Sequence, residues 1–591
     1  MSAYLIPLPD DGRLRVWAPG AQSVEVEFGA SGASGVKELV ALARDAALAA
    51  AGRPGWWVGP RVAPGTDYAY RVDGSDARPD PRSPWQPHGV HAASRTYHTA
   101  EFAWTDGAWR GVDVLGAITY ELHVGTFTPA GTLDAAIERL PHLRDLGVDL
   151  VELMPLAAFP GERGWGYDGV ALYAVHDAYG GPAALQRFVD AAHGLGLGVC
   201  LDVVYNHLGP AGNYLPVFGP YFTDRHETPW GWAVNLDHRD SAEVRAFVVE
   251  NALRWMRDFH VDALRLDAVH ALVDESETHL LTELSEAVGA LAAELGRPLG
   301  LVAESDLNDA VMVTPVARGG LGMDAQWDDD LHHALHACLT GERHGYYVDF
   351  GAPEVLAAVL EGVFLHAGTF STFRGRLWGA PVGRDVDRRR FVVCSQNHDQ
   401  VGNRALGDRP SRVLSDAQLV AAAAVVLLGP FSPMLFQGEE WGTRGPFQYF
   451  TDHDPELGRL VSEGRRNEFA GHGWEELYGD SVEVPDPQAV ETFVASRLAW
   501  AEIEDPAHPD AARHRRMLAA YRELVALRRS WPDLASGAAA GTSVEVGEGG
   551  AWLRMRRGGI DVLIGLSGPA PGAEGAEVLF EFEDHVRVLH P

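Results

Sequence analysis

The chain has 591 residues and a mass of 63.9 kDa, with 46% hydrophobic and 22% charged residues. This balance excludes a disordered chain, a fibrous repeat and a short disulfide-linked scaffold. Acidic residues (82) outnumber Lys and Arg (48), which gives a formal charge of −34. Because such a surface repels phosphate groups, we expect the protein to bind neither nucleic acid nor an anionic membrane.

The first 110 residues carry short runs that favour β-strands, separated by Gly and Pro. They lie at Leu14–Pro19, Val24–Phe28, Trp56–Pro60 and Thr66–Gly74. Short strands at this spacing are typical of a sandwich of two antiparallel sheets. We therefore expect an N-terminal β-sandwich domain at residues 1–110.

From about residue 115, apolar strands alternate with helical patterns. The strands are continuous runs of Val, Leu and Ile, as expected where both faces of a parallel sheet are buried. Eight such units closing on themselves predict a (β/α)8 TIM barrel at residues 111–530. An open, doubly wound sheet is the alternative, but no GxGxxG motif follows the first strand. The predicted strands lie at 118–127, 148–156, 198–207, 261–270, 299–305, 323–327, 391–399 and 433–440, and the clearest helices at 133–146, 183–195, 242–259, 280–295 and 513–529.

Short strand-like runs return after the last helix, at residues 551–557 and 561–567. They predict a small C-terminal β domain at residues 531–591. The expected architecture is therefore multidomain, with a central barrel between an N-terminal β-sandwich and this terminal domain.

The three cysteines, Cys200, Cys338 and Cys394, are far apart in the sequence and form no CxxC motif. This pattern is typical of unpaired thiols in a reducing compartment. The first 15 residues lack the basic start, apolar segment and cleavage site of a signal peptide. The longest strongly apolar stretch, 419–429, is too short to cross a bilayer. We therefore expect a cytoplasmic protein.

Polar side chains follow four of the predicted strands. In a (β/α)8 barrel the catalytic groups stand at the carboxyl ends of the strands, so these side chains should face one shared depression. A single Asp at such a place is more often a helix N-cap. Many polar groups at four strand ends favour an active site instead. They are Asp202, Asn206 and His207 after the third strand, Arg265, Asp267 and His270 after the fourth, Glu304 after the fifth, and Asn397, His398 and Asp399 after the seventh.

The segments that hold these residues resemble known signatures. DVVYNH (202–207), ALRLDAVH (263–270), VAES (302–305) and SQNHD (395–399) resemble, in this order, the four sequence signatures of the α-amylase superfamily. The connecting segments at 120–156, 161–182, 226–237 and 323–336 resemble its maltooligosyltrehalose trehalohydrolase family. The resemblance covers the whole chain, since the first domain resembles the accessory domain of branching and debranching enzymes.

The resemblance implies a role for each carboxylate. Asp267 is the expected nucleophile, and Glu304 the expected general acid and later general base. Asp399 is expected to bind sugar hydroxyls and favour the distorted ring of the transition state. Arg265 precedes Asp267 by two residues on one strand, so both should face the same side, where the guanidinium keeps the carboxylate ionised. Retention of stereochemistry predicts carboxyl groups about 5–5.5 Å apart.

Further residues are expected to contact the sugar. Aromatic faces suit the apolar faces of glucose rings, although core packing is the alternative for any single Trp. For Asp202, a purely structural contact that braces Arg265 is the alternative to substrate binding. The expected substrate-binding residues are Arg265, His207, His270, His398, Tyr167, Asp202 and Asn397, with Trp230, Trp232 and Trp378 as candidates for recognising the trehalose end.

The implied function is that of a retaining glycoside hydrolase. It would cleave the α-1,4 bond next to the terminal trehalose of maltooligosyltrehalose, with maltooligosaccharides as further ligands. A branching or debranching α-glucanase is the alternative, because specificity lies in loops. A non-catalytic glycan-binding protein would need a broken site, whereas all three carboxylates are present. The histidines lie on different strands without HxxxH spacing, so we expect no zinc site. No metal ligand and no cofactor is assigned, and calcium near Asn206, which some relatives bind, stays an open alternative because no full set of oxygen ligands is visible.

Overall fold

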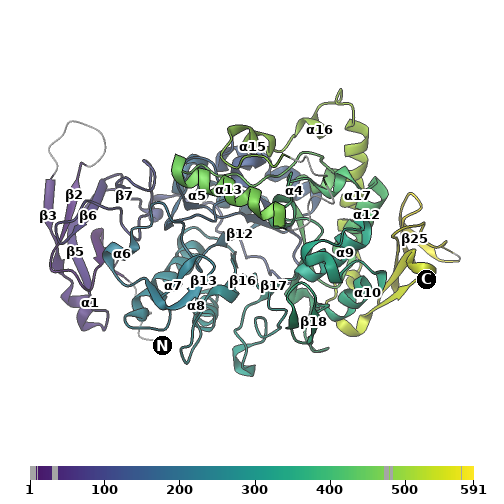
Figure 1. Cartoon of the computed structure of the whole chain (residues 1–591), viewed down its shortest axis with the longest axis horizontal. Coiled ribbons are helices and arrows are strands. Elements are labelled where there is room, and N and C mark those ends of the chain that lie inside the picture. Colours follow the sequence, from purple (N-terminus) through teal and green to yellow (C-terminus); the bar gives the residue numbers. More distant parts are fainter. Residues whose placement is uncertain (1–7, 10, 30–37, 472–477, 479–482, 574) are drawn as a thin grey trace.

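The computed structural model describes residues 8–9, 11–29, 38–471, 478, 483–573 and 575–591. Figure 1 shows an elongated molecule with N-terminal sheets at one end, a barrel in the middle and a C-terminal sheet at the other end. Residues 1–7 and 10, on which the signal-peptide expectation partly depends, lie outside the described residues. Among the helices that are described, none is long and apolar enough to cross a membrane.

Two antiparallel sheets form the N-terminal part, which confirms the predicted sandwich. Alternate residues of their strands, such as Val26 and Tyr70, are buried between them. Arg53 fastens this part to the barrel, because its guanidinium binds Glu243 and Glu250 of a barrel helix at 2.7 and 2.6 Å. One sheet has the order β1(Arg13–Trp17)-β5(Trp56–Arg61)-β4(Ala43–Arg44), and the other β3(Glu38–Ala41)-β2(Val24–Phe28)-β6(Asp67–Val72)-β7(Ser94–Arg95).

The central part is a closed barrel of eight parallel strands, which confirms the predicted fold class. Each strand is buried along its full length, which explains its continuous apolar sequence. Around the barrel, the order is β8(Thr119–Leu122)-β9(Leu150–Leu153)-β12(Gly198–Val203)-β15(Ala263–Leu266)-β16(Gly300–Ala303)-β17(Ala325–Trp327)-β20(Phe391–Cys394)-β21(Ser432–Phe436).

The strands are shorter than the predicted runs. The first run continues as a helical turn, α2(Val124–Phe127), and the seventh as helix α11(His398–Gly402). Asp202 and Arg265 lie in the last residues of β12 and β15, whereas Asp267, Glu304 and the polar residues 397–399 lie just beyond the ends of their strands. The predicted helix 133–146 is also two helices, α3(Leu133–Ile137) and α4(Leu140–Leu146), with Pro141 in the first turn of α4. Proline has no N–H to continue the helix that precedes it.

Helices surround the barrel. Helix α12(Asp416–Leu428) is buried on nearly all sides, because it contacts both β21 and strand β24(Ile560–Gly565) of the C-terminal sheet. This position explains why its sequence is apolar all round instead of along one stripe. The other long helices are α5(Gly181–Gly194), α7(Ser241–Asp258), α8(Leu280–Leu295), α9(Asp329–Thr340), α10(Pro353–Gly362), α13(Pro455–Gly471) and α17(Ala511–Ser530).

The C-terminal part is one antiparallel sheet that packs on the barrel helices. It contacts α10 through β22 and α12 through β24. The buried Arg557 connects the two parts by donating a 2.6 Å hydrogen bond to the carbonyl of Leu428 at the end of α12. The strand order is β22(Thr542–Val546)-β23(Trp552–Arg557)-β24(Ile560–Gly565)-β26(Val586–His590)-β25(Glu577–Phe582).

Candidate active site

One buried arginine contacts three of the predicted carboxyl groups. The register of β12 against β15 places Asp202 beside Arg265. The Nη1 atom of Arg265 lies 2.9 Å from each Asp202 carboxylate oxygen and 2.9 Å from Oδ1 of Asp267. Its Nη2 atom lies 3.5 Å from Oε2 of Glu304. The guanidinium therefore joins the expected nucleophile to the expected general acid.

An amide holds the other oxygen of the Asp267 carboxylate. Asn206 donates from Nδ2 to Oδ2 of Asp267 at 2.9 Å, while Arg265 holds Oδ1. With a donor on each oxygen, the carboxylate has one favoured orientation. The following residue, Ala268, has a φ of 39°, a strained conformation for a residue with a side chain. The sequence analysis did not predict this contact. The position of Asn206 directly after the third strand, near the end of the neighbouring strand that carries Asp267, was the only signal for it.

Glu304 is largely buried behind the nucleophile. Its Oε2 atom accepts a 2.5 Å hydrogen bond from the backbone N–H of Ala268. Burial, and then the charges of Asp267 and Asp399, raise the pKa of Glu304 to about 8 against the opposing effect of Arg265. Burial is the largest of these effects, and the burial of one side chain cannot be seen in a sequence motif. A carboxyl group that is protonated near neutral pH can serve as a general acid.

Tyr167 and His398 lie side by side next to Asp202. The Tyr167 hydroxyl donates to Oδ2 of Asp202 at 2.6 Å and lies 2.8 Å from Nε2 of His398. Gly166 makes this placement possible: its φ is 100°, and a Cβ there would lie 2.3 Å from the carbonyl oxygen of Pro155. Tyr167 was expected as a stacking surface for sugar, and its hydroxyl also belongs to the hydrogen-bonded network around Arg265.

A carboxylate that sequence reasoning missed lies on the inner side of His398. Glu121, in β8, accepts hydrogen bonds from the backbone N–H of His398 at 2.9 Å and from its Nδ1 at 2.5 Å. Burial lowers the pKa of His398, but the negative charges of Glu121 and Asp399 outweigh it and raise that pKa to about 9. Because Glu121 lies inside an apolar run, no motif distinguished it from a structural residue.

The other residues of the fourth signature have different surroundings. Asp399 is 42% exposed, and Asn403 donates to its Oδ1 at 3.1 Å. Asn397 is buried and caps helix α11 by accepting the backbone N–H of Gln400 at 2.7 Å. The structure thus gives Asn397 a role in holding the helix that carries His398, whereas Asp399 remains open to a ligand.

Two further histidines flank the site. The ring of His207 lies 3.0 Å from the carbonyl of Tyr167, and the indole of Trp230 stacks on it with ring centres 4.4 Å apart. Burial lowers the pKa of His207. His270 is 29% exposed and lies 3.9 Å from Asp306. His207 therefore packs against Tyr167 and Trp230, whereas His270 lies near Asp306, which lines the pocket described next.

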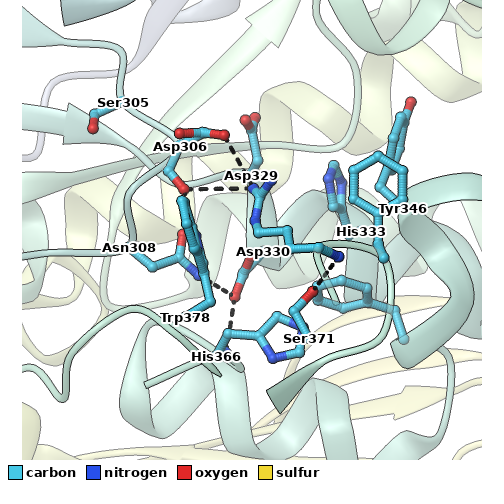
Figure 2. A pocket seen from close by; sticks show the side chains of 13 residues that line it. Ser305, Asp306, Asn308, Asp329, Asp330, His333, Tyr346, His366, Ser371 and Trp378 are labelled. Carbon is cyan, nitrogen blue, oxygen red and sulfur yellow. Dashed lines mark hydrogen bonds and ion pairs between the residues drawn. The ribbon is translucent and has the colours of Figure 1, made fainter. Parts of the chain in front are cut away.

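A pocket of about 460 Å³, open to solvent, continues from Glu304. We call it the hairpin pocket, because residues of the hairpin β18(Thr369–Ser371)–β19(Arg376–Trp378) close one side. Figure 2 shows acidic, imidazole and aromatic side chains directed at a shared space. The residues that line it are Ser305, Asp306, Asn308, Asp329, Asp330, His333, Tyr346, Phe350, His366, Ser371, Phe373, Arg374 and Trp378.

The hairpin pocket combines hydrogen-bonding groups with aromatic faces. Trp378 donates from its indole N–H to the carbonyl of Asp306 at 2.8 Å, and Arg374 lies over its ring at 4.4 Å. The structure therefore separates the three expected tryptophans. Trp378 lines this pocket, whereas Trp230 and Trp232, on the hairpin β13(Phe222–Thr228)–β14(Gly231–Val234), do not and are 49% and 67% exposed.

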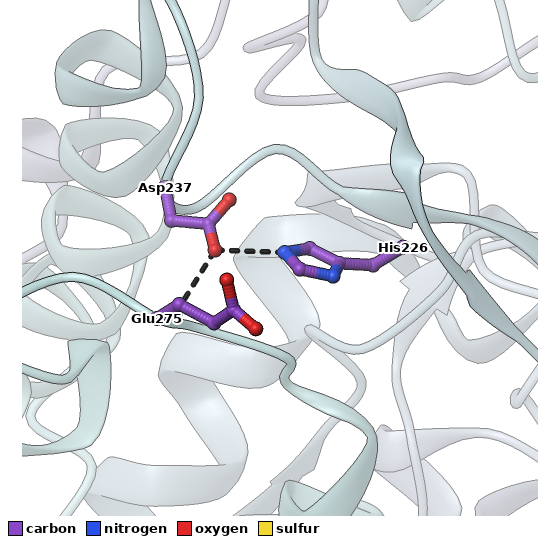
Figure 3. Close-up of side chains that lie close together, drawn as sticks. All are labelled: His226, Asp237 and Glu275. Atoms are coloured by element: carbon purple, nitrogen blue, oxygen red, sulfur yellow. Dashed lines mark hydrogen bonds and ion pairs between the residues drawn. The ribbon is translucent and has the colours of Figure 1, made fainter.

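One group of side chains in the described part of the chain has the spacing of a metal site. Donor atoms of His226, Asp237 and Glu275 lie within 4.8 Å of one another (Figure 3). His226 lies 2.8 Å from Asp237, which also accepts the backbone N–H of Glu275 at 2.9 Å. Arg225 forms ion pairs with both carboxylates. Because this arginine already supplies the positive charge, the group is explained as an ion-pair cluster. Asn206, the other residue considered for metal binding, already uses its side chain: the amide nitrogen donates to Asp267, and the amide oxygen lies 2.5 Å from Nδ1 of His207.

Comparison with known proteins identifies relatives over nearly the full length. A family model described as "Alpha amylase, catalytic domain" matches residues 97–217. A malto-oligosyltrehalose trehalohydrolase from Arthrobacter ramosus is 53% identical, over 88% of this chain and 87% of that protein. Another, from Rhizobium sp. M-11, is 47% identical over 98% and 96%. A Salmonella typhimurium crystal structure assigned as an α-amylase has a TM-score of 0.85 and 35% identity, covering 98% and 97% of the two chains.

Proposed function

The chain belongs to the malto-oligosyltrehalose trehalohydrolase family of the α-amylase superfamily, and from this premise we propose how its residues perform the reaction. The protein is a glycoside hydrolase. Its substrate is a maltooligosaccharide whose end is closed as trehalose, and it cleaves the α-1,4 bond next to that trehalose unit. The products are trehalose and a shorter maltooligosaccharide.

We propose that bond cleavage begins with Asp267 and Glu304. Asp267 attacks the anomeric carbon, and Glu304 gives its proton to the oxygen of the bond that breaks, so that the trehalose-bearing part leaves as a neutral alcohol. Arg265 and Asn206 orient the attacking carboxylate through one hydrogen bond to each oxygen. The sugar is then bound covalently to Asp267.

Hydrolysis of this intermediate reverses the roles. Glu304, now ionised, takes a proton from water while the water oxygen attacks the anomeric carbon and displaces Asp267. Two inversions give net retention of configuration. A separation of about 5–5.5 Å between the two carboxyl groups remains a prediction of this scheme. Asp399 supports both steps by binding hydroxyls of the distorted sugar, a role that its exposure permits.

The observation that carries this assignment is the shared contact with Arg265. One guanidinium at the barrel floor lies 2.9 Å from Asp267 and 3.5 Å from Glu304, so the two carboxyl groups flank a common position. At that position the Glu304 pKa is about 8. A pair with one ionised and one protonated carboxyl group is what nucleophile and acid require.

We propose that the trehalose unit occupies the hairpin pocket. The leaving group must lie on the side of the general acid, and Ser305 and Asp306 continue the chain from Glu304 into this pocket. Trp378 brings an aromatic edge to this pocket, with Arg374 and Arg376 against its ring. Asp306 and Arg374, which form an ion pair, can hydrogen-bond to hydroxyls. Trp230 stacks on His207, and we assign it to holding this histidine beside the sugar that is cleaved. We assign no role to Trp232.

The same proposal covers partners and location. The acidic surface, with a net charge of −34, disfavours nucleic acid. Three free cysteines, two of them buried, are compatible with a reducing compartment, and we place the reaction in the cytoplasm. A neutral oligosaccharide is not repelled by an acidic surface, so this charge does not oppose the proposed substrate.

A product assay tests the substrate. The protein is incubated separately with maltohexaose and with the same chain ended in trehalose, and the released sugars are separated and quantified. We expect rapid release of trehalose and slow attack on maltohexaose. Equal cleavage of both chains, or new α-1,6 branches on longer glucans, would overturn the trehalose-end assignment in favour of an amylase or a branching enzyme.

A further inference from the structure

A buried carboxylate outside the catalytic set lies at one end of a continuous chain of hydrogen bonds. Glu121 and His398 are each 1% exposed and share two hydrogen bonds, one to the backbone N–H and one to Nδ1. On its far side, Nε2 of His398 lies 2.8 Å from the Tyr167 hydroxyl. That hydroxyl is 2.6 Å from Asp202, which binds Arg265 through both oxygens.

The acceptors in this chain determine where its protons lie. The Glu121 carboxylate can only accept, so Nδ1 of His398 must carry a hydrogen. Asp202 accepts from Arg265 and also faces Tyr167, so the single phenolic hydrogen points to Asp202. The Tyr167 oxygen then needs a donor on its other side, and Nε2 of His398 must carry a hydrogen as well. Both ring nitrogens are protonated, and His398 is an imidazolium ion.

We propose that Glu121 is a positioning residue of this hydrolase, which holds His398 as an imidazolium and so sets the direction of the hydrogen bonds that end at Arg265. The inference rests on the proposed roles of Asp267 and Glu304. Glu121 does not touch the sugar. It acts by keeping the Tyr167 hydrogen directed at Asp202, so that Asp202 stays a carboxylate that braces the arginine beneath the nucleophile.

Other charges surround His398, and they determine how large the effect of Glu121 is. Asp399, on the same helix, favours the cation, and Arg265 opposes it. Glu152 faces Glu121 across the register of β8 and β9, and burial raises the pKa of Glu152 to about 8, so it is largely uncharged near neutral pH. The titratable and charged groups that face the imidazole are Glu121, His123, Glu152, Tyr167, Asp202, Arg265 and Asp399.

The test compares the pH dependence of kcat/KM in Glu121→Gln and wild type. The variant keeps the size of the side chain and one accepting oxygen, but removes the charge that favours the imidazolium. The pKa of His398 should fall from about 9 toward its ordinary value of about 6.5. In wild type the basic limb is set by Glu304 near pH 8. In the variant, His398 loses its proton first, so the basic limb should move at least one pH unit lower.

The rate should change more than substrate binding. At about pH 7.5 we expect kcat of Glu121→Gln to fall about 10- to 100-fold, since a small misplacement in an active site has an effect of that size. KM should change less than threefold. Glu152→Gln is the matched control. It removes a buried carboxyl group from the same layer of the barrel, and in the described part of the chain Glu152 forms no hydrogen bond or ion pair with His398. Its basic limb should stay within about 0.3 pH unit of wild type.

Two results would overturn the proposal. One is a Glu121→Gln profile that coincides with wild type, and the other is an equal shift in Glu152→Gln, which would indicate a general effect of charge. Thermal melting checks that each variant folds. If Glu121→Gln does not fold, Glu121→Asp keeps the charge at a shorter reach: a lower kcat with an unshifted basic limb supports the proposal, and an unchanged kcat refutes it.

All variants are assayed for total α-1,4 cleavage of both maltohexaose and its trehalose-ended counterpart. This separates the inference from the proposed function. A wild type without preference for the trehalose-ended chain overturns the substrate assignment, yet the pH comparison still decides the role of Glu121.

Discussion

The two halves of the site are built differently. On the side of the proposed nucleophile, Asp202, Arg265, Asp267 and Glu304 stand at the ends of neighbouring barrel strands, and we call them the strand-end cluster. On the proposed leaving-group side, the hairpin pocket takes its walls from loops and from the β18–β19 hairpin. Charged contacts of 2.9 to 3.5 Å join the buried Arg265 to the carboxyl groups of the strand-end cluster. The hairpin pocket is more open to solvent, and Phe373 at its rim is 48% exposed.

This contrast separates chemistry from specificity. Strand ends are rigid, because each strand is paired on both sides around a closed barrel. They suit groups whose positions must be accurate to a fraction of an ångström. Loops vary more easily, and they determine which glucan occupies the leaving-group side. The comparison predicts large rate losses for changes in the strand-end cluster and moderate, substrate-dependent losses for changes in the hairpin pocket.

The largest effect is expected for Asp267→Asn. This change removes the nucleophile but almost no volume, so kcat should fall by about 10⁴-fold or more on both substrates while the melting temperature stays near that of wild type. Steady-state rates and thermal melting check this. Near wild-type turnover would refute the assignment of the nucleophile.

Glu304→Gln should follow, with a loss of about 10³-fold on natural substrate. The general acid matters most when the leaving group is a poor one, so an activated aryl glucoside should lose far less in its first step. Burst kinetics with that substrate isolate this step. If the aryl glucoside suffers as much as the natural substrate, Glu304 is not the acid.

The pH profile sharpens the same half of the comparison. Glu304 must be protonated to act, and its pKa is raised to about 8. The active form is therefore present below pH 8 and is lost as the pH rises through that value. We expect kcat/KM to fall about fivefold between pH 8 and pH 9, and about tenfold for each further pH unit, measured in buffers of constant ionic strength. A decline that begins near pH 5 would contradict the raised pKa.

Trp378→Ala tests the leaving-group half. Loss of this aromatic side chain should lower kcat/KM for the trehalose-ended chain about tenfold, with a smaller change for maltohexaose. The ratio of the two values is the relevant measurement, since a general loss of structure would lower both equally. If the ratio of kcat/KM for the trehalose-ended chain to that for maltohexaose is unchanged, the trehalose end does not bind in the hairpin pocket.

The smallest effect is expected for Trp232→Ala, which serves as the control for Trp378. Trp232 is 67% exposed and does not line the pocket. We expect less than a twofold change in kcat/KM for either substrate. A tenfold loss specific to the trehalose-ended chain would instead assign the β13–β14 hairpin to recognition of that end.

Sequence reasoning predicted the barrel well and the ends of its elements poorly. All eight strands are present, because buried parallel strands need continuous apolar runs that few other structures share. The predicted runs at 118–127 and 391–399 extend too far. Residues 123–127 include Val, Thr and Phe, which are compatible with a strand, whereas the polar residues 395–399 already contain the N-cap of the next helix, Asn397. A strand ends where its hydrogen bonds to the neighbouring strand end. That neighbour comes from another part of the chain, so the local sequence does not show the end.

The same division applies to the site. The short signatures around Asp267, Glu304 and Asp399 were visible because their spacing is local. The contacts of Glu121 with His398 join residues 277 positions apart, and those of Asn206 with Asp267 span 61 positions. Neither contact has a local sequence signature. The sequence therefore placed Glu121 in a strand and Asn206 in a motif, but it did not show which residues they contact.

By itself, the sequence determined which residue types stand at which strand ends, since strand period and apolar patterning are local properties. Only the tertiary structure decided that Trp378 and the β18–β19 hairpin border the hairpin pocket while Trp230 covers His207. It also decided that burial, more than neighbouring charge, raises the pKa of Glu304. Burial and proximity arise from segments distant in the chain that exclude water together, and no single segment encodes them.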